Sequence, residues 1–146
     1  MIEASLILCD FAEQDPAGKV HMLGAGWSLI GPGPQPHAVV FFIRTSPQKG
    51  PVDITLRLLY ADNQVVTMPG IAGQQRLEFP GQITLRSIPG SPVDAEGQGA
   101  FAVNVGALPL SPGSKYSWVL EIEGKEEART SFYVRESLSD PPAAPS

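Results

Sequence analysis

Cysteine and histidine are scarce in this chain, with one cysteine and two histidines among 146 residues. A single cysteine cannot form an internal disulfide, so the fold has to be stable through packing alone. Cys9 follows the apolar run 6–8, which favours a small core residue over a nucleophile. His21 and His37 are far apart, and neither stands at a zinc-ligand spacing from a second ligand. We therefore expect neither a metal site nor a cofactor.

Charge and long apolar runs are also limited. The ten basic residues are scattered and the net charge is −5, so we expect no nucleic-acid binding through phosphate neutralisation. No apolar stretch approaches the roughly 20 residues of a membrane-spanning helix, so no membrane partner is expected. Residues 1–5 carry no basic region followed by a long apolar region, and no secretory signal peptide is predicted.

Catalytic patterns are missing as well. No serine stands in a Gly-x-Ser-x-Gly elbow, and the glycine-rich segments lack the Gly-Lys-Ser/Thr ending of a phosphate loop. Glu121, Glu123, Glu126 and Glu127 gather around the last predicted turn. Solvated charge that discourages edge pairing explains them, and a weak calcium site is the alternative. The sequence predicts no enzyme and no small-molecule ligand.

Glycine and proline are abundant, with 15 of each, and they cluster between short apolar runs. This distribution of glycine and proline is typical of short strands joined by tight turns. We expect the first two strands to form a hairpin and Pro80 to mark an edge strand or a bulge. One domain over 1–136 and a flexible Pro-rich tail over 137–146 are predicted. The predicted strands span residues 2–11, 19–24, 37–45, 52–60, 65–68, 77–88, 100–105, 116–122 and 128–134.

The segment Leu110-Ser111-Pro112-Gly113-Ser114-Lys115-Tyr116 points to a sandwich rather than a barrel. It resembles the tyrosine corner of fibronectin type III-like domains, whose pattern is Leu-x-Pro-Gly-x-x-Tyr. The resemblance implies an all-β, immunoglobulin-like Greek-key sandwich of about eight to nine strands. It also implies that Leu110 caps the core and that Pro112 and Gly113 make the turn. The Tyr116 hydroxyl would bond to a backbone group a few residues upstream.

Two tryptophans and one strand are the other candidate structural or binding features. Trp118 alternates with polar residues on its strand and is expected in the core, and Trp27 is expected to plug the core after a glycine bend. Strand 37–45 is apolar on both faces. A covering loop or tail explains this pattern. The alternative is that Val40 and Phe42 form an exposed patch for another protein or a symmetry mate.

Two segments near the start of the chain carry a family resemblance. Residues 6–13 contain Leu-Cys-Asp-x-Ala, and residues 19–27 end in a Gly-Ala-Gly-Trp turn. This pattern resembles a family of small uncharacterised β proteins encoded by actinobacteria and some of their phages. The family has a Gly-Gly-Gly-Trp-like turn, and here Ala25 replaces the middle glycine. The resemblance implies no activity.

Three functions remain open. The first is a non-enzymatic structural or assembly module, for instance a decoration or accessory (minor capsid) protein of a phage virion. The second is a cytoplasmic protein- or peptide-binding module of actinobacteria. The third is a carbohydrate-binding or hydrolytic domain, which needs aromatic side chains in loops, whereas nearly all aromatics here except Trp27 fall in predicted strands. We expect a protein partner, either a larger assembly or a homo-oligomer, and a location in the cytoplasm or on a virion.

Overall fold

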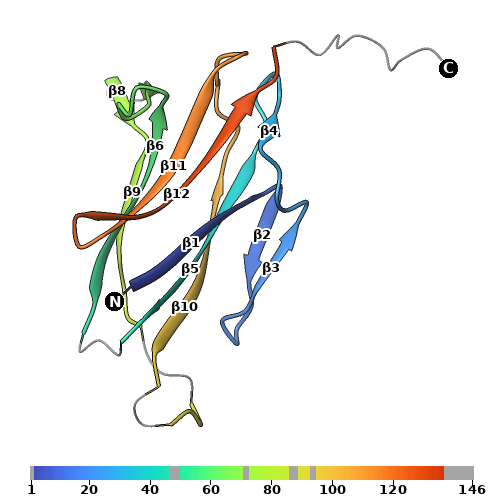
Figure 1. The fold of residues 1–146 in the computed structure, drawn as a ribbon. Coiled ribbons are helices and arrows are strands. Elements are labelled where there is room, and N and C mark those ends of the chain that lie inside the picture. Colours follow the sequence, from blue (N-terminus) through green and yellow to red (C-terminus); the bar gives the residue numbers. More distant parts are fainter. Residues whose placement is uncertain (1, 47–49, 71–72, 86–88, 93–94, 137–146) are drawn as a thin grey trace, which may run out of the picture.

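The strands account for all the regular secondary structure that the computed structural model describes. It describes residues 2–46, 50–70, 73–85, 89–92 and 95–136. Within these ranges the chain forms twelve β-strands and no helix (Figure 1). The all-β prediction is confirmed, although the strand number exceeds the eight to nine expected. The predicted tail, 137–146, lies outside the described residues.

One sheet has three antiparallel strands, with β5 (His37–Thr45) between β1 (Ile2–Cys9) and β10 (Gly97–Val105). Strand β5 has the predicted bounds, whereas β10 begins three residues before the predicted start. In the register, Ala4 of β1 lies opposite Ile43 of β5. The alternating faces of β5 are both apolar because one faces the main core and the other is covered.

The second sheet has five strands. Their order is β4 (Leu29–Ile30), β12 (Lys125–Val134), β11 (Lys115–Ile122), β6 (Val52–Tyr60) and β9 (Glu78–Ile83). Glu123 and Gly124 join β11 to β12, and their φ angles of 51° and 80° are those of a type I′ turn. Pro80 lies in β9, an edge strand, which confirms the prediction for this proline.

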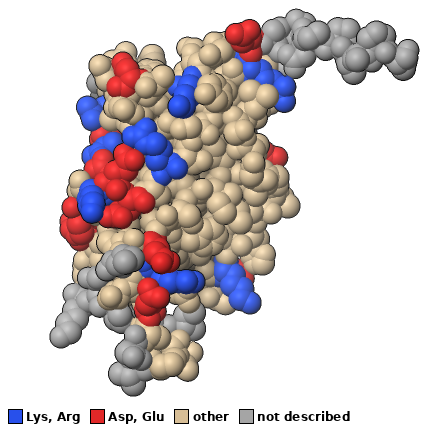
Figure 2. All heavy atoms as spheres, in the orientation of Figure 1, with Lys and Arg blue, Asp and Glu red and all other residues tan. Residues whose placement is uncertain are grey.

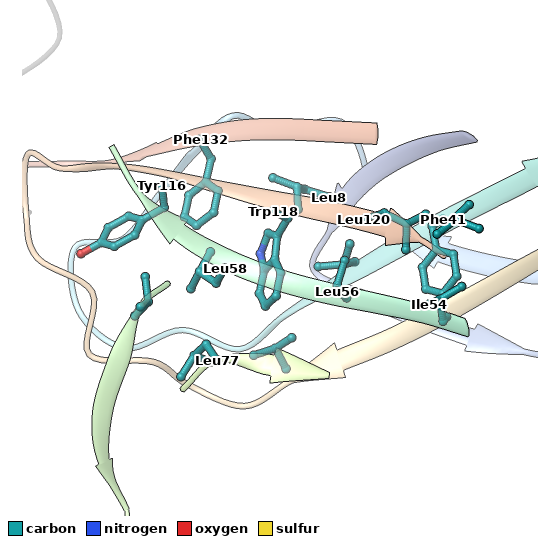
Figure 3. Packing of buried hydrophobic residues seen from close by; sticks show 14 of the residues in the cluster. Leu8, Phe41, Ile54, Leu56, Leu58, Leu77, Tyr116, Trp118, Leu120 and Phe132 are labelled. Atoms are coloured by element: carbon teal, nitrogen blue, oxygen red, sulfur yellow. The ribbon is translucent and has the colours of Figure 1, made fainter. Parts of the chain in front are cut away.

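The main core lies between the two sheets, which pack face to face as a sandwich (Figures 1 and 3). Strand β6 shows why these residues form this layer, because its apolar positions alternate and point inward. Tyr60 follows the same alternation but is 37% exposed at the end of the strand. The largest fully buried side chains of the core are Trp118, Phe132, Ile43, Leu56, Leu58, Leu85, Leu120 and Ile122.

Two further hairpins lie outside the main sheets. Strand β2 (Phe11–Gln14) pairs with β3 (Val20–Leu23), and β7 (Thr67–Gly70) pairs with β8 (Gly73–Arg76). The prediction that one strand over 2–11 pairs with the second strand is wrong. The chain leaves the three-stranded sheet at Asp10, whose N–H donates to the Leu23 carbonyl at 2.9 Å. Residues 2–9 pair with β5 instead, and only β2 joins the hairpin.

The segment before β11 forms a tight corner. The Tyr116 hydroxyl accepts a hydrogen bond from the Ser111 N–H at 2.9 Å. Gly113 has φ +77° and its N–H donates to the Val134 carbonyl at 2.9 Å, while the neighbouring Pro112 is exposed. Leu110 is half-buried against the core. These contacts tie the loop to the last strand.

Candidate interaction surface

An aromatic cluster occupies one end of the core. Trp27 is half-buried, with its ring edge-on to His37 and Phe132 at centroid distances of 5.6 and 5.7 Å. The Trp118 indole N–H donates to His37 Nε2 at 3.0 Å. Burial lowers the pKa of His37 to about 4, and the Gln35 backbone acts to a smaller extent in the other direction. The ring is therefore neutral at pH 7, with its proton on Nδ1, and its role is structural.

The predicted exposed patch is wrong at Val40, which is fully buried. Val40, Cys9, Ala12 and Ala38 form a small second core between the outer face of the three-stranded sheet and the β2–β3 hairpin. The cover is thus a hairpin rather than the loop or tail expected. Cys9 is a buried core residue, as predicted, and burial raises the pKa of its thiol.

Phe42, the other residue of that patch, is half-buried in a groove of about 1210 Å³ beside the hairpin turn. In the strand register it lies between Ser5 of β1 and Ala100 of β10. These small neighbours leave space on both sides of the ring. Lys19, Arg44 and Glu3 also line the groove, so it combines an aromatic group with two cations and one carboxylate.

Six large apolar side chains are exposed among the described residues, and all but Tyr60 and Phe79 form two pairs on neighbouring strands. Phe11 of β2 lies opposite Leu23 of β3, with exposed fractions of 49% and 67%. Leu29 of β4 lies opposite Tyr133 of β12, with exposed fractions of 44% and 52%. Directly opposite side chains in a sheet are near neighbours, so each pair makes one apolar patch.

A hollow of about 540 Å³ lies beside Leu29 of the second pair. Its lining includes Asp10, the Gly24–Trp27 bend, Leu29 and Arg135. The Asp10 carboxylate packs against the Cα of Gly24, where any side chain would collide with it. Asp10 and Gly24 adjoin the first pair in sequence, and Leu29 belongs to the second. We name the four apolar side chains and this hollow the paired apolar surface, comprising Phe11, Leu23, Leu29, Tyr133, Asp10, the 24–27 bend and Arg135.

The polar groups of this surface are few. Its hollow is lined by one carboxylate, one guanidinium, an amide and glycine backbone, with no histidine, cysteine, serine or lysine among the described lining residues. Across the part of the chain that the structure describes, no three His, Cys, Asp or Glu side chains gather as metal ligands. No helix long and apolar enough to cross a membrane occurs in those same residues.

Charged side chains gather elsewhere, over β6, β9 and the β11–β12 turn (Figure 2). Arg57 pairs with Glu78 at 2.9 Å and also with Glu121. Arg129 pairs with Glu126 at 2.9 Å, and this hydrogen bond lowers the pKa of the Glu126 carboxyl. Glu121 and Glu126, which were predicted as solvated charge at an edge, are therefore in ion pairs. Such half-exposed pairs contribute little to stability.

The β2–β3 hairpin is tied to β10 by the Asn104 side chain. Its Oδ1 accepts from the Ala12 N–H at 3.2 Å, and its Nδ2 donates to the Ala12 carbonyl at 2.7 Å. An Asn104→Ala variant loses both bonds, each of which contributes about 1 kcal/mol. Opening of the hairpin should then be about tenfold or more frequent. Cys9 lies beneath the hairpin, so labelling of its thiol under native conditions should accelerate by the same factor.

Gln98→Ala is the control for this measurement. Gln98 lies on the same strand and is exposed, and none of the hydrogen bonds found in the described part of the chain joins it to the hairpin. Its variant should label at the wild-type rate. Equal labelling rates for Asn104→Ala and wild type would contradict the role of Asn104.

Comparison with known proteins gives one match. A family model described as a family of unknown function (DUF6941) matches residues 4–135, which include the paired apolar surface and both main sheets apart from the first two residues of β1. No curated protein matches the chain. No solved structure matches it either.

Proposed function

The chain belongs to the DUF6941 family of unknown function, and from this premise we propose that it is a non-catalytic assembly module. It docks onto another protein through the paired apolar surface. The observation that carries the proposal is the exposure of Phe11, Leu23, Leu29 and Tyr133 as two pairs, with Leu29 lining a hollow whose other lining residues, Asp10 and Gly24, adjoin Phe11 and Leu23 in sequence. Contiguous exposed apolar patches mark contact sites in soluble proteins.

Covering the apolar pairs contributes to the affinity of such a contact, with about half of each side chain still to be buried. Burying one large apolar side chain completely contributes roughly 1.5–3 kcal/mol. The Asp10 carboxylate and the Arg135 guanidinium beside the hollow add charge to the rim, which restricts the partner surfaces that fit. Apolar area supplies affinity and the two charges supply specificity.

The assembly that we propose is a phage virion, with the chain as a decoration or accessory (minor capsid) protein. Support comes from the resemblance of residues 6–13 and 19–27 to β proteins of actinobacteria and their phages. We also infer that residues 110–116 are a tyrosine corner and that the sandwich is of the Greek-key type. The Tyr116–Ser111 hydrogen bond supports this inference. A scaffold tied at that corner holds the paired apolar surface in one shape.

A cytoplasmic peptide-binding module is the second candidate function. The groove beside Phe42 favours it, since it combines an aromatic group with Lys19 and Arg44. Carbohydrate binding has less support, because the exposed aromatics Phe11 and Tyr133 each lie opposite a leucine within a strand. We place peptide binding second because both aromatic rings that line its groove, Phe42 and Phe101, are already partly buried.

A variant with Phe11→Asp and Leu23→Asp tests the assembly role. Wild-type protein should co-purify with particles at a fixed ratio to their main protein. The double variant should be depleted at least tenfold, because burying two unpaired carboxylates costs several kcal/mol. Quantitative mass spectrometry of purified particles measures the ratio.

Gln74→Asp with Gln75→Asp is the matched control, since it adds the same charge at exposed positions of β8. This variant should enter particles as wild type does. A wild-type chain that is absent from particles, or equal incorporation of both double variants, would show that the assembly role is wrong.

A further inference from the structure

Asp10 is the one aspartate whose carboxylate has no partner among the described residues. The structure describes four aspartates, and the carboxylates of Asp15, Asp53 and Asp62 each accept at least one hydrogen bond. The exposed Asp10 carboxylate accepts none from the described part of the chain, and no ion pair joins it to Arg135, which lines the same hollow. Its charge therefore adds no bond to this part of the fold.

The backbone nevertheless holds this carboxylate in one place. The Asp10 N–H donates to the Leu23 carbonyl at 2.9 Å, and the Gly26 N–H donates to the Leu8 carbonyl at 2.8 Å. These two bonds tie the glycine bend to the chain around Asp10. Gly24 has φ +62° and no side chain, so it leaves the space that the carboxylate fills. A charge that is fixed in this way and has no internal partner is preorganised for an external one.

The side chains around Asp10 are apolar. Phe11 follows it in the chain, Leu23 is its backbone partner, and both of these side chains are exposed. Trp27 and Leu29 line the hollow with it. A partner that covers the paired apolar surface also removes the Asp10 carboxylate from water. Burying a charge is strongly unfavourable unless an opposite charge is paired with it, so the partner has to supply a cation at this point.

We propose that the partner presents a basic side chain, arginine or lysine, between apolar residues, and that its charged end pairs with the Asp10 carboxylate. This inference rests on the docking role of the paired apolar surface. The aliphatic stem of a basic side chain packs on Phe11 and Leu23 while its charge reaches the carboxylate. Arg135 adjoins the second apolar pair instead, because its N–H donates to the Ile30 carbonyl at 2.9 Å. The net charge of −5 also favours a basic partner over an acidic one.

A double-mutant cycle with two short peptides tests the pairing without the partner itself. The probes are acetyl-Leu-Arg-Leu-amide and acetyl-Leu-Gln-Leu-amide, each titrated into wild type and into an Asp10→Asn variant. Amide chemical shifts measured by NMR give the affinities. Wild type should bind the basic peptide at least about fivefold more tightly than the neutral one, with shifts at residues 10–12 and 23–29. Asp10→Asn keeps the shape of the side chain and should abolish this preference.

Glu13→Gln is the matched control for the peptide titrations. It removes the same charge from an exposed position of β2 that does not line the hollow. This variant should keep the wild-type preference for the basic peptide. Equal affinity of wild type for the two peptides, or a preference that survives in Asp10→Asn, overturns the proposal.

Incorporation into purified particles separates this inference from the docking role on which it rests. Asp10→Asn should be depleted at least about tenfold, because it leaves the buried cation of the partner unpaired, whereas Glu13→Gln should enter as wild type does. Depletion of the Phe11→Asp and Leu23→Asp double variant with normal entry of Asp10→Asn would show that the surface docks but the basic group is wrong. Normal entry of both variants would overturn the docking role and this inference together.

Discussion

Replacing Trp118 by alanine should lower the free energy of unfolding by about 4 kcal/mol, the range for large aromatic residues in a core. Trp118 is fully buried at the centre of β11, between Leu58 and Thr130 in the register (Figure 3). The variant leaves a cavity against Phe79, and it leaves the buried His37 Nε2 without its donor. Urea denaturation followed by circular dichroism measures the loss.

A Trp118→Phe variant separates the two contributions. Phenylalanine fills most of the cavity but cannot donate to His37, so we expect a loss of about 2 kcal/mol. A loss below about 1 kcal/mol for Trp118→Ala would contradict the placement of this side chain in the main core.

Lowering the pH from 7 to about 4 should destabilise the protein by about 3 kcal/mol through His37 alone. In the unfolded chain His37 takes up a proton near pH 6.5, whereas in the folded chain its pKa is about 4. The unfolded state therefore binds more protons between these values. The stabilisation is complete above pH 6.5 and is lost as the pH falls towards 4. The residues that pack on this ring are Trp27, Trp118 and Phe132.

A His37→Gln variant is the control, because the glutamine carbonyl can accept from Trp118 but does not titrate. Its stability should change little between pH 7 and 5, where wild type loses stability steadily. Hydrogen bonds from arginines lower the pKa of Glu78 and Glu126, so their contributions are lost only at lower pH. Equal slopes for wild type and His37→Gln over this range would show that His37 is not the titrating group.

Sequence periodicity predicted the central strands well. Strands β5 and β6 have the predicted bounds, because a proline precedes each run and a turn or loop segment follows it. Strand β11 was predicted within one residue, since Tyr116, Trp118, Leu120 and Ile122 alternate with more polar residues. Such patterns are local, and burial on one face enforces them.

The candidate surface could not be predicted from the same periodicity. Phe11 continues the apolar run of residues 2–9, and its exposure follows from the change of sheet at Asp10. That change depends on two hydrogen bonds between residues that are distant in the sequence. The Asp10 N–H donates to the Leu23 carbonyl, and the Gly26 N–H donates to the Leu8 carbonyl. Val40 was predicted in an exposed patch but is buried, because the β2–β3 hairpin covers it. A hydrogen bond from Asn104 of β10, which is distant in the sequence, holds that hairpin in place. Strand β4 has only two residues, too few for a pattern.

Hydrogen exchange of the chain in its native assembly, compared with the isolated protein, tests the central claim most directly. If the paired apolar surface is the docking site, amides of residues 10–12, 23–30 and 133–135 should be protected in the assembly. Protection around Phe42 and Lys19 would indicate peptide binding in the groove. An exchange pattern in which residues 10–12, 23–30 and 133–135 are unchanged would contradict the proposed role of this surface.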